Sequence, residues 1–338
     1  MKRIDRRALL TGLLAGFGVA GCGPRETTGG GAGGAAGTGG AGGGKTYLIG
    51  MSQANKGEPW RQAMNDQIAA AAAKHPDLKV VFADAAQNSA KQVADVENFL
   101  QQGIDLLIIS PNEAAPLTEV VAEVHGKGIP VIVIDRKVEG EAYTMWIGAD
   151  NEKIGERAGA YVAEWAKREK RSPCRVLELR GLAGSTPAKE RGDGFRAGIK
   201  GSPDVKIIAS QTGEWLREKA IPVSQSMIAA QPDADVIYAH NDPMAEAGYI
   251  SARTAGLDLQ KVLFVGIDAL ATPDGGIRSV MDGRLDVTYV YPTGGTEAID
   301  WAVKILKEGA KPEREVVLET EEVTSANAAQ LYTKYGGK

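Results

Sequence analysis

Runs of apolar residues recur along most of the chain, and polar residues follow directly where each run ends. The clearest run is 131–134, which reads Val-Ile-Val-Ile with no polar residue between its members. Four consecutive β-branched residues predict a strand that is buried on both faces, as in a parallel sheet covered by helices. Pro130 precedes this strand, and Asp135 and Arg136 follow it. A ligand of an open α/β sheet binds just beyond such carboxyl ends.

Strand patterns alternate with amphipathic helix patterns twice over. In the first set we predict strands at 47–52, 78–85, 106–110, 131–135 and 145–150, with helices at 59–74, 90–102 and 116–127. In the second set we predict helices at 151–168, 185–200, 217–230 and 243–255, and strands at 175–181, 206–213, 236–241 and 263–268. A strand at 285–292, a helix at 294–308 and an extended segment at 316–323 follow. The sequence therefore predicts an α/β fold with two similar lobes, whose parallel sheets the last segments complete by crossing between them.

The N-terminus has the pattern of an exported lipoprotein. Basic residues precede an apolar run at 8–20 that is too short to span a bilayer, and the run ends in Val-Ala-Gly-Cys at 19–22. This pattern resembles a lipobox, so we predict that residues 1–22 are a signal peptide ending at Cys22, which would be lipidated; the alternative is a chance Cys after an apolar leader. The Arg6-Arg7 pair also weakly resembles a twin-arginine export signal. Residues 23–44 are mostly Gly, Ala and Thr, which predicts a flexible tether.

Charge and motif content exclude several classes of function. The formal net charge is −4, and the chain without its first 21 residues would be more acidic still, so nothing indicates a nucleic-acid partner. The three His residues, at 75, 125 and 240, lack metal-ligand spacing. A Gly-x-Ser-x-Gly nucleophile elbow is missing from the sequence. Cys174 has no partner other than Cys22 and is expected to be an inert thiol.

Polar residues at the predicted strand ends suggest a hydrogen-bonding pocket. They are Ser52, Asp135 with Arg136, Asn241 and Asp268. A single polar strand end would favour the ordinary explanation that loops begin there. Several together, with carboxylate, amide and guanidinium groups, match the paired donors and acceptors of sugar hydroxyls.

Two Trp residues occur at the same predicted edge. Trp60 opens a helix beside Arg61, and Trp215 follows the strand at 206–213. An indole can stack on the apolar face of a sugar ring, although packing against the next helix would explain each Trp as well. Trp146, Trp165 and Trp301 lie inside predicted elements and are expected in the core.

Five motifs together identify a family resemblance. They are Pro-Val-Ile-Val-Ile-Asp-Arg at 130–136, Gly-Ala-Asp-Asn at 148–151, Glu-Leu-Arg-Gly at 178–181 with Glu-Arg-Gly-Asp-Gly-Phe at 190–195, Ala-His-Asn-Asp at 239–242 and Val-Gly-Ile-Asp at 265–268. With them, the chain from about 47 to 323 resembles the type I periplasmic sugar-binding proteins of bacterial ABC importers, the ribose- and galactose-binding family. Ser-Gln at 52–53, Pro-Trp-Arg at 59–61 and the His-Asn-Asp run look most like its galactofuranose-binding branch.

The resemblance implies two Rossmann-like lobes joined by a three-crossover hinge, with the ligand clamped between them. The first lobe would span 45–149 plus about 291–318, and the second 150–290 plus about 319–338. Asp135 and Arg136 would bind sugar hydroxyls from the first lobe, Arg191, Asn241 and Asp268 from the second lobe and the hinge, and Trp60 and Trp215 would stack on the ring. Without the resemblance, Arg191 would be an ordinary helix-surface residue.

Two parts of the implied site remain open in the sequence. The segment 55–58 is longer than in ribose-binding members, so any of Asn55, Glu58 and Arg61 could reach the ligand. The last polar contact implied by the resemblance falls near 289–291, where this chain reads Tyr-Val-Tyr and lacks the Gln of the ribose-binding members. Ribose is therefore a less favoured ligand, and Tyr291 is the residue that we assign to this contact. Ser52 completes the predicted set.

These features predict a substrate-binding lipoprotein of an ABC-type sugar importer, which captures a monosaccharide by hinge closure and acts as a monomer without a cofactor. One alternative is a sensor lipoprotein that presents its ligand to a membrane receptor. A transcription regulator would need a DNA-binding motif before residue 47, where the lipobox and tether stand. An enzyme would need a carboxylic acid as proton donor, and Asp135 beside Arg136 is expected to stay ionised.

Overall fold

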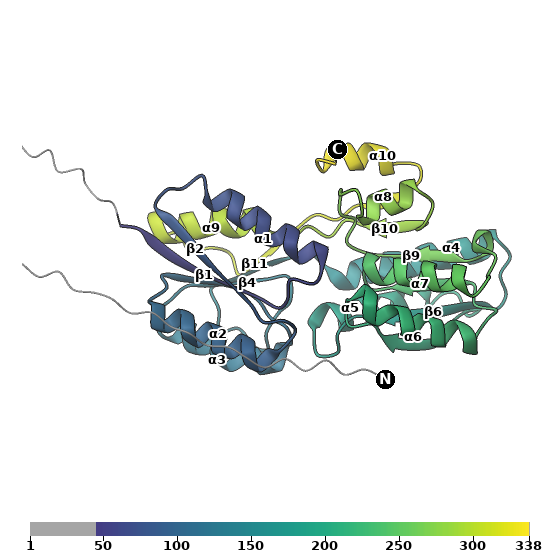
Figure 1. Ribbon diagram of the computed structural model, residues 1–338, viewed down its shortest axis with the longest axis horizontal. Helices are drawn as coiled ribbons and strands as arrows, with labels where there is room; N and C mark the ends of the chain where they lie inside the picture. The colour runs from purple at the N-terminus through teal and green to yellow at the C-terminus, as the bar shows by residue number, and fades with distance from the viewer. Residues whose placement is uncertain (1–44, 338) are drawn as a thin grey trace, which may run out of the picture. The chain divides into compact units, whose positions relative to one another are not determined.

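The computed structural model describes residues 45–337 (Figure 1). The predicted signal peptide, the lipidation site at Cys22 and the tether at 23–44 lie outside the described residues.

The first lobe is built around a six-stranded sheet with the strand order β11-β5-β4-β3-β1-β2, in which all pairs are parallel. Its strands are β1 (Tyr47–Gln53), β2 (Leu78–Asp84), β3 (Leu106–Ser110), β4 (Val131–Ile134), β5 (Met145–Gly148) and β11 (Glu315–Val317). The central strands β3, β4 and β5 are buried throughout, as their unbroken apolar runs predict.

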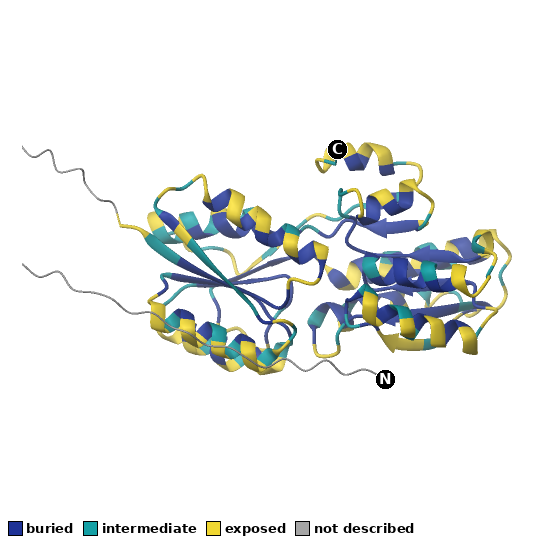
Figure 2. Ribbon diagram, in the orientation of Figure 1, coloured by how far each residue is buried: buried dark blue, intermediate teal, exposed yellow. Residues whose placement is uncertain are grey.

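Helices cover both faces of this sheet. On one face α1 (Pro59–Ala72) packs against α9 (Gly295–Glu308), and on the other α2 (Ser89–Gln102) packs against α3 (Ala114–Gly126) (Figure 1). Each helix buries one apolar face and exposes the opposite one, which Figure 2 shows as alternating dark and yellow faces. Because helices cover both faces, polar and apolar residues do not alternate along the central strands.

The second lobe repeats the design with the strand order β12-β10-β9-β8-β6-β7. Its strands are β6 (Cys174–Arg180), β7 (Val205–Thr212), β8 (Val236–Ala239), β9 (Leu263–Val265), β10 (Val287–Tyr289) and β12 (Glu322–Thr324). Its main helices are α4 (Asn151–Arg168) with α5 (Thr186–Ile199) and α6 (Arg217–Ala230) with α7 (Asp242–Thr254). Only β12 runs antiparallel to its neighbour.

Glycines bring α4 and α5 into close contact. A Cβ atom on Gly155 of α4 would collide with the backbone carbonyl of Arg191 on α5, so only glycine allows the two helices to approach this closely. The contact fixes where Arg191 emerges from α5.

The chain passes between the lobes three times, after β5, after β10 and after β11. The predicted fold class, two mostly parallel α/β lobes with three crossovers, is confirmed. The segment predicted at 316–323 is two short strands in different sheets, because the third crossing interrupts it.

The sequence patterns missed three short helices and extended several strands too far. The missed helices are α8 (Gly276–Met281), α10 (Ala328–Lys334) and the 3-10 helix η1 (Leu259–Lys261). The strand predicted at 285–292 covers only Val287–Tyr289, because the chain leaves the second sheet there for the hinge. None of the helices within 45–337 combines the length and the apolar character needed to cross a membrane.

Two of the single-residue expectations concern the core. Cys174 is buried at the start of β6, and burial raises the pKa of its thiol to about 12, which fits an inert thiol. Trp146 and Trp165 are buried as expected, whereas Trp301 on α9 is only partly buried.

Candidate functional site

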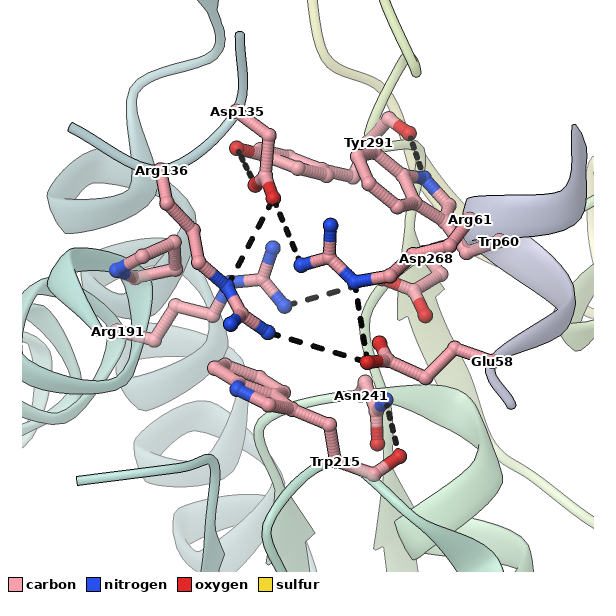
Figure 3. Close-up of a pocket in the computed structure, with 11 residues that line it drawn as sticks. Glu58, Trp60, Arg61, Asp135, Arg136, Arg191, Trp215, Asn241, Asp268 and Tyr291 are labelled. Carbon is pink, nitrogen blue, oxygen red and sulfur yellow. Dashed lines mark hydrogen bonds and ion pairs between the residues drawn. The ribbon is translucent and has the colours of Figure 1, made fainter. Parts of the chain in front are cut away.

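A polar cavity of about 250 Å³ lies between the two lobes (Figure 3). It is lined by Glu58, Trp60, Arg61, Asp135, Arg136, Pro187, Arg191, Trp215, Asn241, Asp268 and Tyr291. Of the residues that the sequence predicts for the site, only Ser52 and Asn55 are not among the lining residues. Pro187 was not predicted.

The lining residues come from the carboxyl ends of strands in both sheets. Asp135 and Arg136 follow β4, Asn241 follows β8 and Asp268 lies three residues after β9. Because parallel strands end at the same edge of a sheet, residues far apart in the sequence converge there. Arg61 on α1 and Arg191 on α5 approach the cavity from the two lobes.

Arg61 and Asp135 form a buried ion pair at the first-lobe wall. Nη2 of Arg61 lies 3.1 Å from Oδ2 of Asp135, and both residues are at most 5% exposed. Nη1 of Arg61 donates to Gln53 Oε1 at 2.7 Å and to Ser110 Oγ at 2.8 Å, and Nε donates to Glu58 Oε1 at 3.1 Å. Arg61, rather than Arg136, is therefore the closest cationic partner of Asp135.

Arg136 reaches across the cavity toward the second lobe. Its Nη1 donates to the carbonyl of Asn112 at 2.7 Å, and its guanidinium lies 5.5 Å from the centre of the Trp215 ring. Its carboxylate partners are more distant, with Glu58 and Asp135 oxygens both at 3.9 Å. Burial, with the nearby Arg61 charge, lowers the pKa of Arg136 to about 10, so it remains a cation at neutral pH.

Arg191 is the central cation of the second lobe. It is 3% exposed, so the reading as a helix-surface residue is wrong. Nε donates to Asn151 Oδ1 at 2.8 Å, Nη1 donates to the carbonyl of His240, and Nη1 lies 3.8 Å from Asp268 Oδ1. Its guanidinium also lies 4.5 Å from the centre of the Tyr291 ring. These contacts leave the Arg191 fork fixed beside the cavity.

Tyr291 joins the hinge to the first lobe. Its hydroxyl donates to Asp135 Oδ1 at 3.0 Å and accepts from Asn151 Nδ2 at 3.3 Å, and its carbonyl accepts from Trp60 Nε1 at 2.8 Å. Burial and the Asp135 charge raise the pKa of this hydroxyl well above its usual range, so it stays protonated and keeps donating.

Trp215 is held in an unusual backbone conformation. Its φ is +72°, and a Cβ on Gly181 would collide with the indole, so glycine is needed beneath the ring. Asn241 Nδ2 donates to the Trp215 carbonyl at 3.0 Å, while Asn241 Oδ1 caps α7 by accepting from Met244 N at 3.2 Å. Trp215 Nε1 is buried and has no hydrogen-bond partner within 45–337. The ring both packs into the lobe and lines the cavity.

Asp268 is a carboxylate that the protein leaves unsatisfied. It has a φ of +130°, and its side chain accepts no hydrogen bond from the part of the chain that the structure describes, with Arg191 at 3.8 Å as its only ion-pair partner there. Burial raises the pKa of the Asp268 carboxyl well above its usual range, although Arg191 opposes the shift. Its oxygens are available to a hydroxyl of a ligand.

The charges around the cavity balance. Three guanidinium groups, those of Arg61, Arg136 and Arg191, face three carboxylates, those of Glu58, Asp135 and Asp268. Such a set offers donors and acceptors without a strong net charge, which suits a neutral ligand with several hydroxyls. No group of His, Cys, Asp or Glu side chains within 45–337 is arranged to hold a metal ion.

Sequence reasoning missed the residues that hold the lining groups in place. Asn151, at the start of α4, contacts both Arg191 and Tyr291, and Gln53 and Ser110 at the ends of β1 and β3 both bind Arg61. Their positions at strand and helix ends could have marked them in the sequence as residues of the site. Asn55, which was predicted, does not line the cavity, but its Nδ2 donates to Oε1 of the lining residue Glu58 at 2.7 Å. Ser52, also predicted, is buried, and its hydroxyl has no hydrogen-bond partner within 45–337.

His240 acts through its backbone rather than its ring. The ring is buried against Glu178, with Nε2 3.2 Å from Oε1, and burial lowers the pKa of His240 although Glu178 opposes the shift. Burial alone would raise the pKa of Glu178, but hydrogen bonds from His240 and Arg196 hold it well below its usual range. Only the His240 carbonyl meets Arg191.

The model of one protein family matches most of the chain. That family is described as a periplasmic binding protein domain, and the match covers residues 49–311. It includes the first sheet except the first two residues of β1 and the whole of β11, and it includes every residue that lines the cavity.

Three similar proteins illustrate the relationship. The ribose import binding protein of Bacillus subtilis is 31% identical over 72% of this chain and 76% of its own. The galactofuranose-binding protein of Escherichia coli is 32% identical over 79% of this chain and 84% of its own. Among solved structures, the fructose-binding periplasmic domain of a hybrid two-component system has a TM-score of 0.81 and 41% identity, over 85% of this chain and 94% of its own.

Proposed function

The chain belongs to the periplasmic binding protein family, with relatives among the ribose- and galactofuranose-binding proteins, and we propose that it captures a monosaccharide for an ABC-type sugar permease. This is a family of solute-binding proteins and not of enzymes, so no bond of the ligand is made or broken. The periplasm is the compartment in which the family works.

The observation that carries the proposal is the composition of the cavity. Three guanidinium groups and three carboxylates offer paired hydrogen bonds, and Trp60 and Trp215 add aromatic surface. We assign ligand contacts to Glu58, Trp60, Arg61, Asp135, Arg136, Arg191, Trp215, Asn241, Asp268 and Tyr291, and supporting roles to Ser52 and Asn55.

The proposed mechanism is closure of the two lobes around the sugar. Contacts between the lobes outside the cavity support it: Ala114 N donates to the Gly184 carbonyl at 3.0 Å, and Lys137 N donates to Thr186 Oγ1 at 3.0 Å. A sugar favours the closed form only through the extra contacts it makes there, because a ligand shifts an equilibrium by its differential affinity. The closed form would then dock on the permease as a single copy of the chain.

The proposed cellular form is a lipoprotein. Cleavage before Cys22 and lipidation of its thiol would anchor the protein to a membrane, with 23–44 as a tether between the anchor and the two lobes. Metabolic labelling with a palmitate analogue tests this, and the expected result is label on the wild-type chain that is lost in Cys22→Ser. Label that persists in the variant would contradict the anchor.

A second function has support from one comparison. The structure with 41% identity is the periplasmic domain of a hybrid two-component system, which makes a sensor lipoprotein the alternative to an importer component. The two proposals share the sugar site and differ in the membrane partner. Crosslinking in membranes of the native host, followed by mass spectrometry, distinguishes a permease from a receptor.

The sugar itself is tested by a thermal-shift screen of the full-length protein. The panel holds D-ribose, L-arabinose, D-fructose, D-galactose, D-glucose and myo-inositol. A ligand at a hundred times its dissociation constant adds about 2.7 kcal/mol to the free energy of unfolding. We expect a clear rise in Tm for at least one sugar, and no rise across the panel would contradict sugar binding.

A further inference from the structure

A second cavity lies directly beside the first. Trp60 and Asp268 line both cavities. Figure 3 shows these two residues on the same side of the first cavity. The second cavity therefore begins where the pocket for a sugar ring ends.

We propose that this second cavity is a subsite for the second ring of a disaccharide whose first ring occupies the pocket between the lobes. The inference rests on the proposed function and deepens it, because it widens the ligand class from free monosaccharides to short glycosides.

The walls of the second cavity suit a sugar ring. Pro59 from the first lobe and Pro243 and Leu270 from the second give it apolar surface, and Arg217 and Asp274 give it polar groups. This mixture of apolar faces and a few polar groups is typical of small-ligand sites. Since Pro59 is exposed, the subsite opens to solvent there, so that a longer ligand would have room to enter.

Two polar groups on its walls have unused hydrogen-bonding capacity within residues 45–337. The Asp268 carboxylate accepts no hydrogen bond from residues 45–337, and it stands between the two cavities, where it can receive a hydroxyl from either ring. Arg217 is paired with Glu246 through Nη2, but its Nε is buried without a hydrogen-bond partner in the described chain. Unpaired polar groups of this kind cost stability, and a ligand hydroxyl offsets that cost.

One wall of the second cavity is a tightly held loop. Asp242 Oδ2 accepts from Ala269 N at 2.7 Å, and Asp242 Oδ1 accepts from Thr288 Oγ1 at 2.6 Å. A Cβ on Gly276 would collide with the Asp242 carboxylate, so only glycine lets the loop approach this closely. The loop that carries Leu270 is thus fixed against α7, so this wall of the proposed subsite is in place without a ligand.

The test compares free sugars with disaccharides that contain them, using the full-length protein and isothermal titration calorimetry. The two probe pairs are D-fructose with sucrose and L-arabinose with α-1,5-arabinobiose. D-galactose with methyl β-D-galactofuranoside, a single-ring glycoside, serves only as a reference for a small anomeric substituent. The variant is Leu270→Trp, which fills the second cavity. Leu259→Trp, at a partly buried Leu of η1 away from both cavities, is the matched control, and Leu270→Ala checks that position 270 tolerates substitution.

For the pair whose free sugar binds, we expect the wild-type chain to bind the disaccharide within about tenfold of the free sugar. Leu270→Trp is expected to weaken the disaccharide at least tenfold more than the free sugar, while Leu259→Trp and Leu270→Ala leave the ratio of the two affinities unchanged. A wild-type chain that binds a free sugar but rejects its disaccharide would overturn the subsite alone. The subsite is also overturned if Leu270→Trp weakens both ligands equally, or if no disaccharide of the set binds. The thermal-shift panel of free sugars, run on the same protein, then shows separately whether the proposed sugar function stands.

Discussion

The guanidinium of Arg136, in the first lobe, lies 5.5 Å from the centre of the Trp215 ring in the second lobe. Arg191 approaches the same ring from the second lobe, also at 5.5 Å. A cation near an indole face is stabilised by the ring quadrupole, and more so when water is excluded. The Trp215 ring therefore lies close to two cations that approach the cavity from opposite lobes.

Replacing Trp215 should weaken sugar binding. We expect Trp215→Ala to lower the affinity for the bound sugar by about 2 kcal/mol, or roughly thirtyfold, because a buried aromatic contact is lost. Trp215→Phe keeps a ring and should lose less. Titration calorimetry measures the affinities, and equal affinities for the wild type and the Ala variant would contradict a stacking role.

Replacing Asp268 by Asn should raise the stability of the folded protein and lower its affinity for sugar. Burial disfavours the charged form of the Asp268 carboxyl, and Arg191 at 3.8 Å offsets this only in part. We therefore expect Asp268→Asn to raise the free energy of unfolding at pH 7 by about 1 kcal/mol. The same change replaces a charged acceptor by a neutral one, so sugar affinity should fall about tenfold. Urea unfolding and calorimetry measure the two effects.

Asp258→Asn on the surface of the second lobe is the control for the carboxylate change and should not alter sugar affinity. An Asp268→Asn variant that binds sugar as tightly as the wild type would remove Asp268 from the ligand contacts.

Asp242 should give the protein a measurable pH dependence of stability. Burial raises the pKa of the Asp242 carboxyl from about 3.8 to about 6, although hydrogen bonds from Thr288 and Ala269 oppose the shift. The stability that it contributes is fully present below about pH 3.8 and is lost as the pH rises through about 6, since the folded state holds the proton more tightly. Over this window the loss amounts to about 3 kcal/mol.

The measurement is the difference in free energy of unfolding between wild type and Asp242→Asn from pH 4 to 7. The Asn side chain does not titrate, so the difference should move in favour of the variant as the pH rises. A part of this difference that does not change with pH reflects the hydrogen bonds altered by the substitution. A difference that stays flat across this range would show that Asp242 is not buried as an acid with a raised pKa.

Much of the architecture was predictable because its signals are local. The unbroken apolar run at 131–134 predicted a fully covered strand, and the Pro-Trp pair at 59–60 predicted the start of α1. The short helices α8 and α10 were missed because six or seven residues carry too little periodicity to stand out from a loop.

The site was predictable only in part. Polar residues at strand ends converge because strands are parallel, so Asp135 and Asn241 could be found from the sequence. The burial of Arg191 could not, because it depends on the close approach of α4 and α5 that Gly155 permits. The pairing of Arg61 with Asp135, residues 74 apart in sequence, depends likewise on tertiary packing.

The central claim is that a sugar is held by charged groups from both lobes, and titration of the screened sugar into two matched variants tests it most directly. Arg191 and Arg196 lie on the same helix, but only Arg191 lines the cavity, whereas Arg196 pairs with Glu178. Arg191→Met and Arg196→Met each remove one cation from α5. Arg196→Met therefore shows how much of any loss of affinity comes from a general effect on the fold of this helix.

We expect Arg191→Met to weaken sugar binding about a hundredfold, because charge-assisted hydrogen bonds to the ligand are lost, while Arg196→Met stays within about threefold of the wild type. Equal affinities for the wild type and Arg191→Met would contradict the account.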